Sequence, residues 1–318
     1  MFKLLMILIL VSSNALGEIT AYGCQYNAKN IKHACLKEES KKYTDYFFAI
    51  YDGHETANVS DYLESNFYSS FKRIQSLYEA TKVKSFVSSL FINCFAKTYE
   101  SLDEKYRNEG SSVLVAYIFN NYIYIVNCGD SRAAICIKGQ PYNLNAEHVP
   151  LRKDEMERIQ IAGGRVSIQY KNKTNNALVN NIHLSDHNYI DLAKILYPTE
   201  ETDIFHKYCK YFENFEVYGE PLVNRQCILT RAIGYKSLKN LVIPIPEIKK
   251  IALDENVEFV IMASSWFWKF ISTIQAVEII KNCFLANKSL QDATRELAYS
   301  AINKGAKDNI TVILIKLK

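Results

Sequence analysis

The sequence predicts an α+β fold in which antiparallel strands and helices occupy separate layers. Strand-like segments follow one another at hairpin spacing, and helical segments come in consecutive pairs. No internal repeat is visible, and single strands do not alternate regularly with single helices. Because such alternation is needed to wind a parallel sheet, the order of the elements favours helix pairs packed on antiparallel sheets.

The first third of the chain is expected to contain strands followed by two helices. Strands are expected at residues 19–24, 34–37 and 46–51, where apolar, β-branched or aromatic residues gather before turn residues. Apolar residues then recur every three or four positions over residues 56–79 and 82–106. That spacing places them on one face of a helix, so it predicts an amphipathic pair.

A β-hairpin is expected in the middle of the chain. Residues 113–119 and 122–127 flank Asn120-Asn121, a pair that tolerates the left-handed backbone of a two-residue turn. A further strand is expected at 133–138. The charged amphipathic segment 151–162 then predicts a helix that ends at Gly163-Gly164.

Residues 167–226 are rich in Asn, Tyr and Lys and have weak periodicity, so they are interpreted as a long insertion. The C-terminal part returns to regular patterns. It predicts a strand at 258–263, helices near 273–284 and at 290–303, and a final strand at 311–316.

Composition excludes several classes of protein. Hydrophobic residues make up 48% of the 318 residues and charged residues 23%, which is typical of a globular chain and not of a disordered one. The net charge of +4 is spread along the sequence, which does not favour binding to nucleic acid. The longest apolar run, residues 4–11, is far shorter than the roughly 20 residues of a transmembrane helix.

The N-terminus has the layout of a secretory signal peptide. A short basic start precedes the apolar run, and small residues near Ala15 and Gly17 could be cleaved. We therefore expect a signal peptide at 1–17, a mature domain at 18–318 and a secreted or secretory-pathway location. A first strand, an uncleaved anchor and a cytoplasmic location stay open as alternatives. The eight cysteines could pair or remain free thiols, and no C-x-x-C spacing indicates zinc.

An ordered series of short motifs runs from Tyr22 to the C-terminus. The segments are YFFAIYDGH (46–54), GSSVLVAYI (110–118), YIVNCGDSRAAICIKGQ (124–140), LNAEHVP (144–150), RIQIAGGRV (158–166), LTRAIG (229–234), IPIPEI (243–248), FVIMASSWFW (259–268) and GAKDNITVILI (305–315). Together they resemble the metal-dependent protein phosphatase 2C (PPM-type) family. The resemblance implies a central antiparallel β-sandwich flanked by pairs of antiparallel helices, a four-layer αββα fold. It also implies that 167–226 is an enlarged form of the family's flap.

The resemblance further implies a site for two Mg²⁺ or Mn²⁺ ions, which generate a hydroxide-like nucleophile and neutralise the phosphoryl group. These hard ions need oxygen ligands, so several carboxylates must converge. By the resemblance, Asp52 is the bridging acid, Gly53 a carbonyl donor and His54 the general acid. Asp130 matches an acid near a third metal, and Asp308 matches the last metal ligand.

Other positions depart from the family's pattern. No acid occurs in His33–Leu36, where an early Glu-Asp pair belongs, and Ser265 stands where a late Asp belongs. The phosphate-binding Arg is absent, and Lys29 and Lys32 are its weak substitutes. Tyr235 and Lys269 also replace expected acids.

Two divalent ions bring four positive charges, which the retained acids do not balance, and uncompensated charge in a confined site is unfavourable. We therefore expect no complete dinuclear centre. The sequence favours a pseudophosphatase that binds or regulates a protein partner, such as a phosphoprotein or a kinase complex. Two alternatives stay open: a weakly active Ser/Thr phosphatase that depends on Mg²⁺ or Mn²⁺, and a secreted effector that binds through the insertion. Each retained acid could also simply cap a turn.

Overall fold

The computed structural model describes residues 5–9, 19–26, 31–39, 44–80, 87–172, 178–183, 215–224 and 226–317. Within these residues the chain divides into two compact units. The first unit is formed by residues 1–147, 232–237 and 244–318, and the second by 148–231 and 238–243. The predicted insertion at 167–226 falls in the second unit, and 173–177 and 184–214 of it lie outside the described residues.

Two antiparallel sheets form the centre of the first unit. One has the strand order β1-β2-β15-β14-β7-β8, and the other has the order β13-β6-β5-β4-β3, with β12 paired to β5. The strands of the first sheet are β1 (Leu5–Ile9), β2 (Thr20–Tyr26), β7 (Arg132–Ile137), β8 (Gln140–Asn143), β14 (Val257–Ala263) and β15 (Ile310–Lys316). Those of the second sheet are β3 (Ile31–Glu39), β4 (Thr44–His54), β5 (Gly110–Phe119), β6 (Tyr122–Cys128), β12 (Ile233–Gly234) and β13 (Glu247–Ala252).

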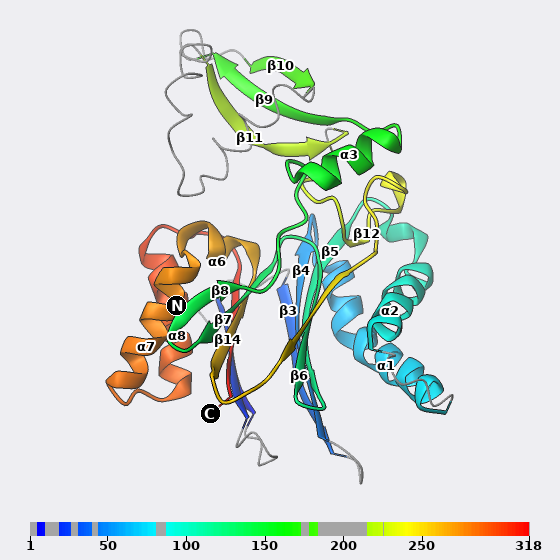
Figure 1. Cartoon of the computed structure of the whole chain (residues 1–318). Helices are drawn as coiled ribbons and strands as arrows, with labels where there is room; N and C mark the ends of the chain where they lie inside the picture. The colour runs from blue at the N-terminus through cyan, green and yellow to red at the C-terminus, as the bar shows by residue number, and fades with distance from the viewer. Residues whose placement is uncertain are drawn as a thin grey trace. The chain divides into compact units, whose positions relative to one another are not determined.

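Helices cover the outer face of each sheet (Figure 1). The helices α1 (Asn58–Ala80) and α2 (Val87–Ser101) pack on the second sheet, and α6 (Ser265–Phe270), α7 (Thr273–Leu285) and α8 (Leu290–Asn303) pack on the first. A third hydrophobic cluster fills the space between the sheets. The predicted four-layer αββα fold is confirmed.

Strand β4 explains how one apolar run serves two cores. Its side chains alternate between the faces of the sheet, as in any strand. Tyr46, Phe48 and Ile50 join the core between the sheets, whereas Phe47 and Tyr51 join the core under α1 and α2. A strand buried on both faces needs no polar alternation.

Local signals place several boundaries where the sequence indicates them. Asn120 and Asn121 have positive φ angles of 49° and 61°, as the predicted two-residue hairpin requires. The side chain of Ser272 accepts a hydrogen bond from the backbone of Gln275, and the Gln275 side chain accepts one from the backbone of Ser272. This capping box begins α7. Short 3₁₀ turns lie at Glu104–Tyr106 and Lys236–Leu238.

The N-terminal apolar run forms a first strand, which the sequence left open as an alternative. Leu5–Ile9 pairs antiparallel with β2, as the first-strand alternative to a signal peptide would have it. The cleavage region at 10–18 lies outside the described residues, so cleavage and secretion stay predictions. Six cysteines of the described part, at positions 24, 94, 128, 136, 227 and 283, are buried free thiols.

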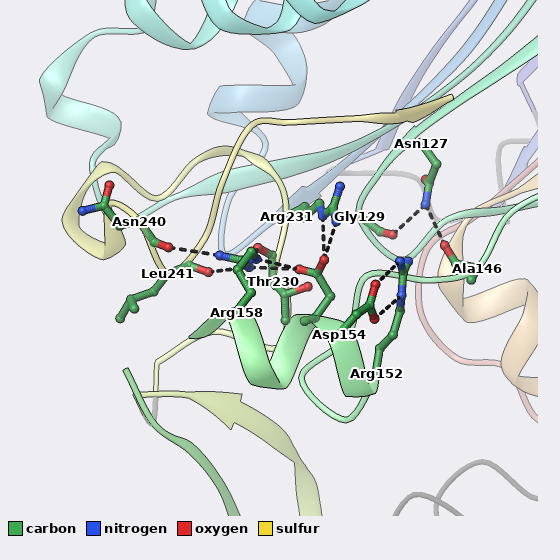
Figure 2. Close-up of polar contacts among 11 residues, drawn as sticks. Asn127, Gly129, Ala146, Arg152, Asp154, Arg158, Thr230, Arg231, Asn240 and Leu241 are labelled. Atoms are coloured by element: carbon green, nitrogen blue, oxygen red, sulfur yellow. Dashed lines mark hydrogen bonds and ion pairs between the residues drawn. The ribbon is translucent and has the colours of Figure 1, made fainter. Parts of the chain in front are cut away.

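The second unit contains α3 (Lys153–Ile161) and a sheet of β9 (Val166–Asn172), β10 (Leu178–His183) and β11 (Phe215–Val223) in the order β10-β9-β11. This sheet was not anticipated. Helix α3 carries Glu155, which is 1% exposed and accepts hydrogen bonds from both Arg158 and Arg231. Arg158 also donates to the carbonyl oxygens of Thr230, Asn240 and Leu241 (Figure 2). The network joins three segments of this unit.

Across the described residues, no helix combines the length and the apolar character that crossing a bilayer requires.

Candidate functional site

The C-terminal end of β4 carries the first two residues of the site. Asp52 and His54 are two positions apart on one strand, so both side chains point to the same face of the sheet. That is the face of Ile50, which packs in the core between the sheets. The chain thus places a carboxylate and an imidazole where the apolar stripe of β4 ends.

Asp130 reaches the same place from the turn between β6 and β7. Gly129 has a φ of +137°, a conformation that disfavours other residues, and a Cβ there would lie 2.0 Å from Ser112 Cβ. Asn127 shapes the turn by donating hydrogen bonds to the carbonyl oxygens of Gly129 (3.0 Å) and Ala146 (3.1 Å), as Figure 2 shows. Gly129 therefore allows the turn to pass close to Ser112, and this brings Asp130 to β4.

Asp52, His54 and Asp130 form one compact group, which we call the Asp-His-Asp cluster. One ligand atom from each residue lies within 4.8 Å of the others. Nε2 of His54 and Oδ1 of Asp130 are 3.5 Å apart. Asp52 and Asp130 are each only 6% exposed. The three residues could hold a metal ion.

Burial and mutual charge shift the proton affinities of the cluster. Burial, together with the neighbouring carboxylates of Asp130 and Asp308, raises the pKa of Asp52 to about 7 against the lowering effect of His54. Burial by itself would lower the pKa of His54, but the negative charge of Asp130 prevails and raises it to about 9. Burial also opposes ionisation of Asp130, yet His54 and Lys269 hold its pKa below the ordinary value. The ionised carboxylate of Asp130 therefore stabilises a positive charge on His54.

Two further residues lie beside Asp52. Ser265 follows β14 and donates its hydroxyl to Oδ2 of Asp52 at 3.5 Å. Asp308 precedes β15, is exposed, and accepts a hydrogen bond from the backbone of Asn309 at 2.7 Å. Asp308 therefore has the turn-capping contact that the sequence left open, while its charge still acts on Asp52.

Strand β3 pairs with β4, and its register determines which residue lies directly across from Asp52. Ile31 is the direct cross-strand neighbour of Asp52, and it is 1% exposed in the core between the sheets. His33 pairs with Ile50, and Leu36 with Phe47. Glu38 pairs with Asp45, seven residues along the strand, which is roughly 23 Å away. An apolar side chain thus occupies the position directly across from Asp52.

The two lysines named as weak phosphate ligands have different outcomes. Nζ of Lys32 lies 3.0 Å from Oδ1 of Asp61 in the first turn of α1, so an acid already balances its charge. Lys29 lies outside the described residues.

The remaining departures from the family pattern have structural partners. Tyr235 is buried and packs its ring over Gly110, where a Cβ would lie 2.4 Å from that ring. Trp266 stacks on Phe270 with ring centroids 6.0 Å apart, and Nζ of Lys269 lies 4.6 Å from the centre of the Trp266 ring.

Sequence reasoning missed two charges that act on the cluster. Glu55 has a left-handed φ of 70° and adds to the negative surroundings of His54. Lys269 acts on Asp130, although the sequence indicated only that an acid was missing at position 269.

Comparison with known proteins identifies the family. The family model for protein phosphatase 2C matches residues 21–191 and 213–310, which is well over half of the chain. The chain belongs to the protein phosphatase 2C family. This confirms the resemblance of the ordered motifs, and the fold of the first unit agrees with it.

Relatives within the family are distant. The chain is 25% identical over 302 residues to "Probable protein phosphatase 2C 52" of Oryza sativa subsp. japonica, covering 93% of this chain and 50% of that protein. It is also 25% identical to mouse (Mus musculus) "Protein phosphatase 1B", covering 85% of this chain and 61% of the relative. The chain thus spans about half to three fifths of the length of these curated relatives.

Solved structures share the fold. A phosphatase from a pathogenic strain of Toxoplasma gondii superposes with a TM-score of 0.68 at 14% identity, covering 99% of this chain and 95% of that one. A Toxoplasma gondii serine-threonine phosphatase 2C gives a TM-score of 0.61 at 16% identity, covering 99% of each chain. The phosphatase 2C family in general depends on Mg²⁺ or Mn²⁺, and the Asp-His-Asp cluster is where such dependence would reside in this chain.

Proposed function

We propose that this chain is a pseudophosphatase, a phosphatase 2C domain that binds a protein partner without hydrolysing phosphate esters. The observation that carries the proposal is the register of β3 against β4. Ile31 lies opposite Asp52, and the nearest downstream acids of β3, Glu38 and Glu39, pair with the far end of β4. These two positions lie seven and eight residues along β3 from Ile31, roughly 23 Å or more from Asp52, so the register keeps them away from it.

The contact of Ser265 with Asp52 supports the same proposal. At the position where the family places a metal-binding Asp, this chain presents a hydroxyl that donates to Oδ2 of Asp52. A donor at that oxygen competes for the lone pairs that a bridging ligand offers to metals. Ser265 in place of Asp removes one negative charge. Its hydroxyl also binds one oxygen of the Asp52 carboxylate.

The charge balance also argues against two ions. Asp52, Asp130 and Asp308 supply at most three negative charges to balance the four positive charges of two divalent ions. One of these acids, Asp130, is already opposed by His54 and Lys269. Because uncompensated buried charge is strongly unfavourable, the present residues do not fit a dinuclear centre.

The proposed ligand of the domain is a protein, either a phosphoprotein or a member of a kinase complex. A folded phosphatase 2C domain without turnover can shield a phosphorylated site or position another enzyme. The match covers only half of the rice relative. An activity of that whole relative is therefore only a proposal for this chain.

A turnover assay tests the proposal. The purified chain is incubated with a phosphothreonine peptide and millimolar Mn²⁺ or Mg²⁺, beside the Asp52→Ala variant and an active phosphatase 2C. We expect phosphate release from the chain to equal that of the variant. Release that depends on Mn²⁺ and is lost in Asp52→Ala would instead establish the rival function, a weakly active Ser/Thr phosphatase.

A further inference from the structure

His54 and Asp130 form an ion pair in the Asp-His-Asp cluster, and its two atoms are farther apart than in a close hydrogen bond. Nε2 of His54 and Oδ1 of Asp130 are 3.5 Å apart, and within the described residues neither atom has a hydrogen-bond partner. A charge-assisted N–H···O bond is about 2.7–2.9 Å long. Two buried polar atoms thus face each other at a distance that is too long for such a bond.

The spacing suits two ligands of one small cation. Bonds of about 2.1 Å to nitrogen and oxygen at a tetrahedral angle separate the two ligand atoms by about 3.4 Å. The observed separation is 3.5 Å, and the ligand atom of Asp52 lies within 4.8 Å of both. A small movement of the Asp52 carboxylate towards the other two ligand atoms completes a three-ligand arrangement.

We propose that Asp52, His54 and Asp130 bind a single transition-metal ion of the Zn²⁺ type, with the imidazole of His54 as a ligand. The proposal rests on the proposed function, because it assigns to one non-hydrolytic ion the cluster in which the family holds two catalytic ones. Imidazole favours borderline metals such as Zn²⁺ over Mg²⁺, which prefers oxygen ligands only. Two carboxylates balance the two positive charges of one ion.

The surroundings of His54 support a cation at this place. Oδ1 of Asp130 lies 3.5 Å from Nε2 of His54, and the ligand atom of Asp52 lies within 4.8 Å of the other two. A divalent ion displaces the Nε2 proton and answers the same negative surroundings with twice the charge. As a ligand, His54 no longer carries the proton that the family's general acid would donate.

The proposal and the family's arrangement assign different ligands, which makes them separable. In the proposal His54 is a ligand and Asp308 is not. In the family's arrangement Asp308 is a ligand and His54 is not. Asp308 is exposed, lies outside the three-residue cluster and already accepts a hydrogen bond from Asn309.

Calorimetric titration with Zn²⁺, together with the absorption spectrum of the Co²⁺ complex, tests the assignment on the purified chain. We expect one ion per chain and a Co²⁺ spectrum that contains a nitrogen ligand. His54→Ala should weaken Zn²⁺ affinity at least about tenfold and remove that signature, whereas Asp308→Asn should change affinity less than about threefold. Zn²⁺ at 100 times its dissociation constant should raise the unfolding temperature by about 5 °C in the parent chain and not in His54→Ala.

Asp130→Asn guards against misfolding of the alanine variant, since it keeps the shape of the turn, and it too should weaken Zn²⁺ binding at least about tenfold. The proposal is wrong if Zn²⁺ does not bind, or if Asp308→Asn weakens binding more than His54→Ala. Failure of Zn²⁺ binding without any turnover leaves the pseudophosphatase standing. Binding of two Mn²⁺ ions with phosphate release overturns both.

Discussion

His33 shows at the scale of one residue how this domain differs from an ordinary sandwich core. It points into the core between the sheets, is 6% exposed, and neither ring nitrogen has a hydrogen-bond partner among the described residues. A Cβ on Gly23 would lie 3.3 Å from its ring, so the histidine packs directly against β2. Burial lowers the pKa of His33 to about 4. The neutral ring is thus held in an apolar layer without polar compensation.

We expect His33→Leu to stabilise the chain by about 1 kcal/mol at pH 7, because it removes a buried unsatisfied polar group. The folded pKa of about 4 lies below the ordinary value of 6.5, so the parent loses stability as the pH falls from 6.5 towards 4. The stabilisation by His33→Leu, relative to the parent, should therefore be larger at pH 5 than at pH 7. Urea unfolding at both pH values measures it. His33→Gln, which does not titrate, should abolish the pH dependence without the gain at pH 7.

For Asp52 the stability of the fold changes with pH in the opposite direction. Its folded pKa of about 7 lies above the ordinary 3.8, so stability is lost as the pH rises through 7. In the presence of EDTA, Asp52→Asn should raise the free energy of unfolding by on the order of 2 kcal/mol at pH 8 and by clearly less at pH 5.5. Denaturant titration of variant and parent at both pH values decides; a variant that is less stable at pH 8 would contradict the assigned electrostatics.

At the scale of elements, the ends of the helices are set by local contacts. Helix α3 ends where Gly163 adopts a φ of +81° and where the N–H of Gly164 donates to the carbonyl of Ile159 at 2.9 Å. These are the geometry and the long backbone bond of a Schellman motif. The two glycines have different reasons to be glycine. Nothing lies within 4 Å of a Cβ on Gly163, whereas a Cβ on Gly164 would lie 2.5 Å from Leu241 Cδ2.

We expect Gly163→Ala to cost about 1 kcal/mol, the conformational penalty of the left-handed backbone alone. Gly164→Ala should cost more, about 1–3 kcal/mol, because Leu241 and Ile159 must move. Denaturant unfolding compares the two variants, which differ by one position. Equal losses would mean that the packing against Leu241 does not constrain the turn.

At the scale of the whole molecule, one buried ion-pair network links separate segments of the second unit. The second unit joins α3 to residues 230–231 and 240–241 through Glu155 and its two arginines. Burial opposes ionisation of Glu155, but hydrogen bonds and charge from Arg231 lower its pKa to about 2. Because this folded pKa lies below the ordinary 4.5, the contribution is present above pH 4.5 and is lost as the pH falls towards 2.

Glu155→Gln should destabilise the second unit by about 3 kcal/mol at pH 7, since it leaves two arginines without their buried anion. Glu157→Gln is a matched control on the same helix, because its partner Lys153 is exposed and 3.9 Å away. That variant should change stability by less than about 0.5 kcal/mol. Hydrogen exchange of β9 and α3 resolves the difference, and equal exchange in both variants would contradict the role of Glu155.

Local patterns were sufficient for most elements of the first unit. Helix α8 begins and ends where its periodicity indicates, and the Asn120-Asn121 hairpin forms as expected. Strand β13 was missed because its side chains are half-buried or exposed, and helix α6 because six residues make less than two turns. The sheet of β9, β10 and β11 was missed because the insertion is polar and has weak periodicity, and because β11 pairs with β9 from a distant part of the insertion.

The amino-acid sequence by itself determined the family, the layered α+β fold and the loss of acids at the expected metal positions, because these depend on residue identity and spacing along the chain. Tertiary structure decided which residues meet. It placed Ile31 and Ser265 against Asp52, brought His54 to Asp130, and directed Lys32 to Asp61. Those contacts depend on strand register and turn geometry, since side chains from separate elements approach each other only when the sheets have formed.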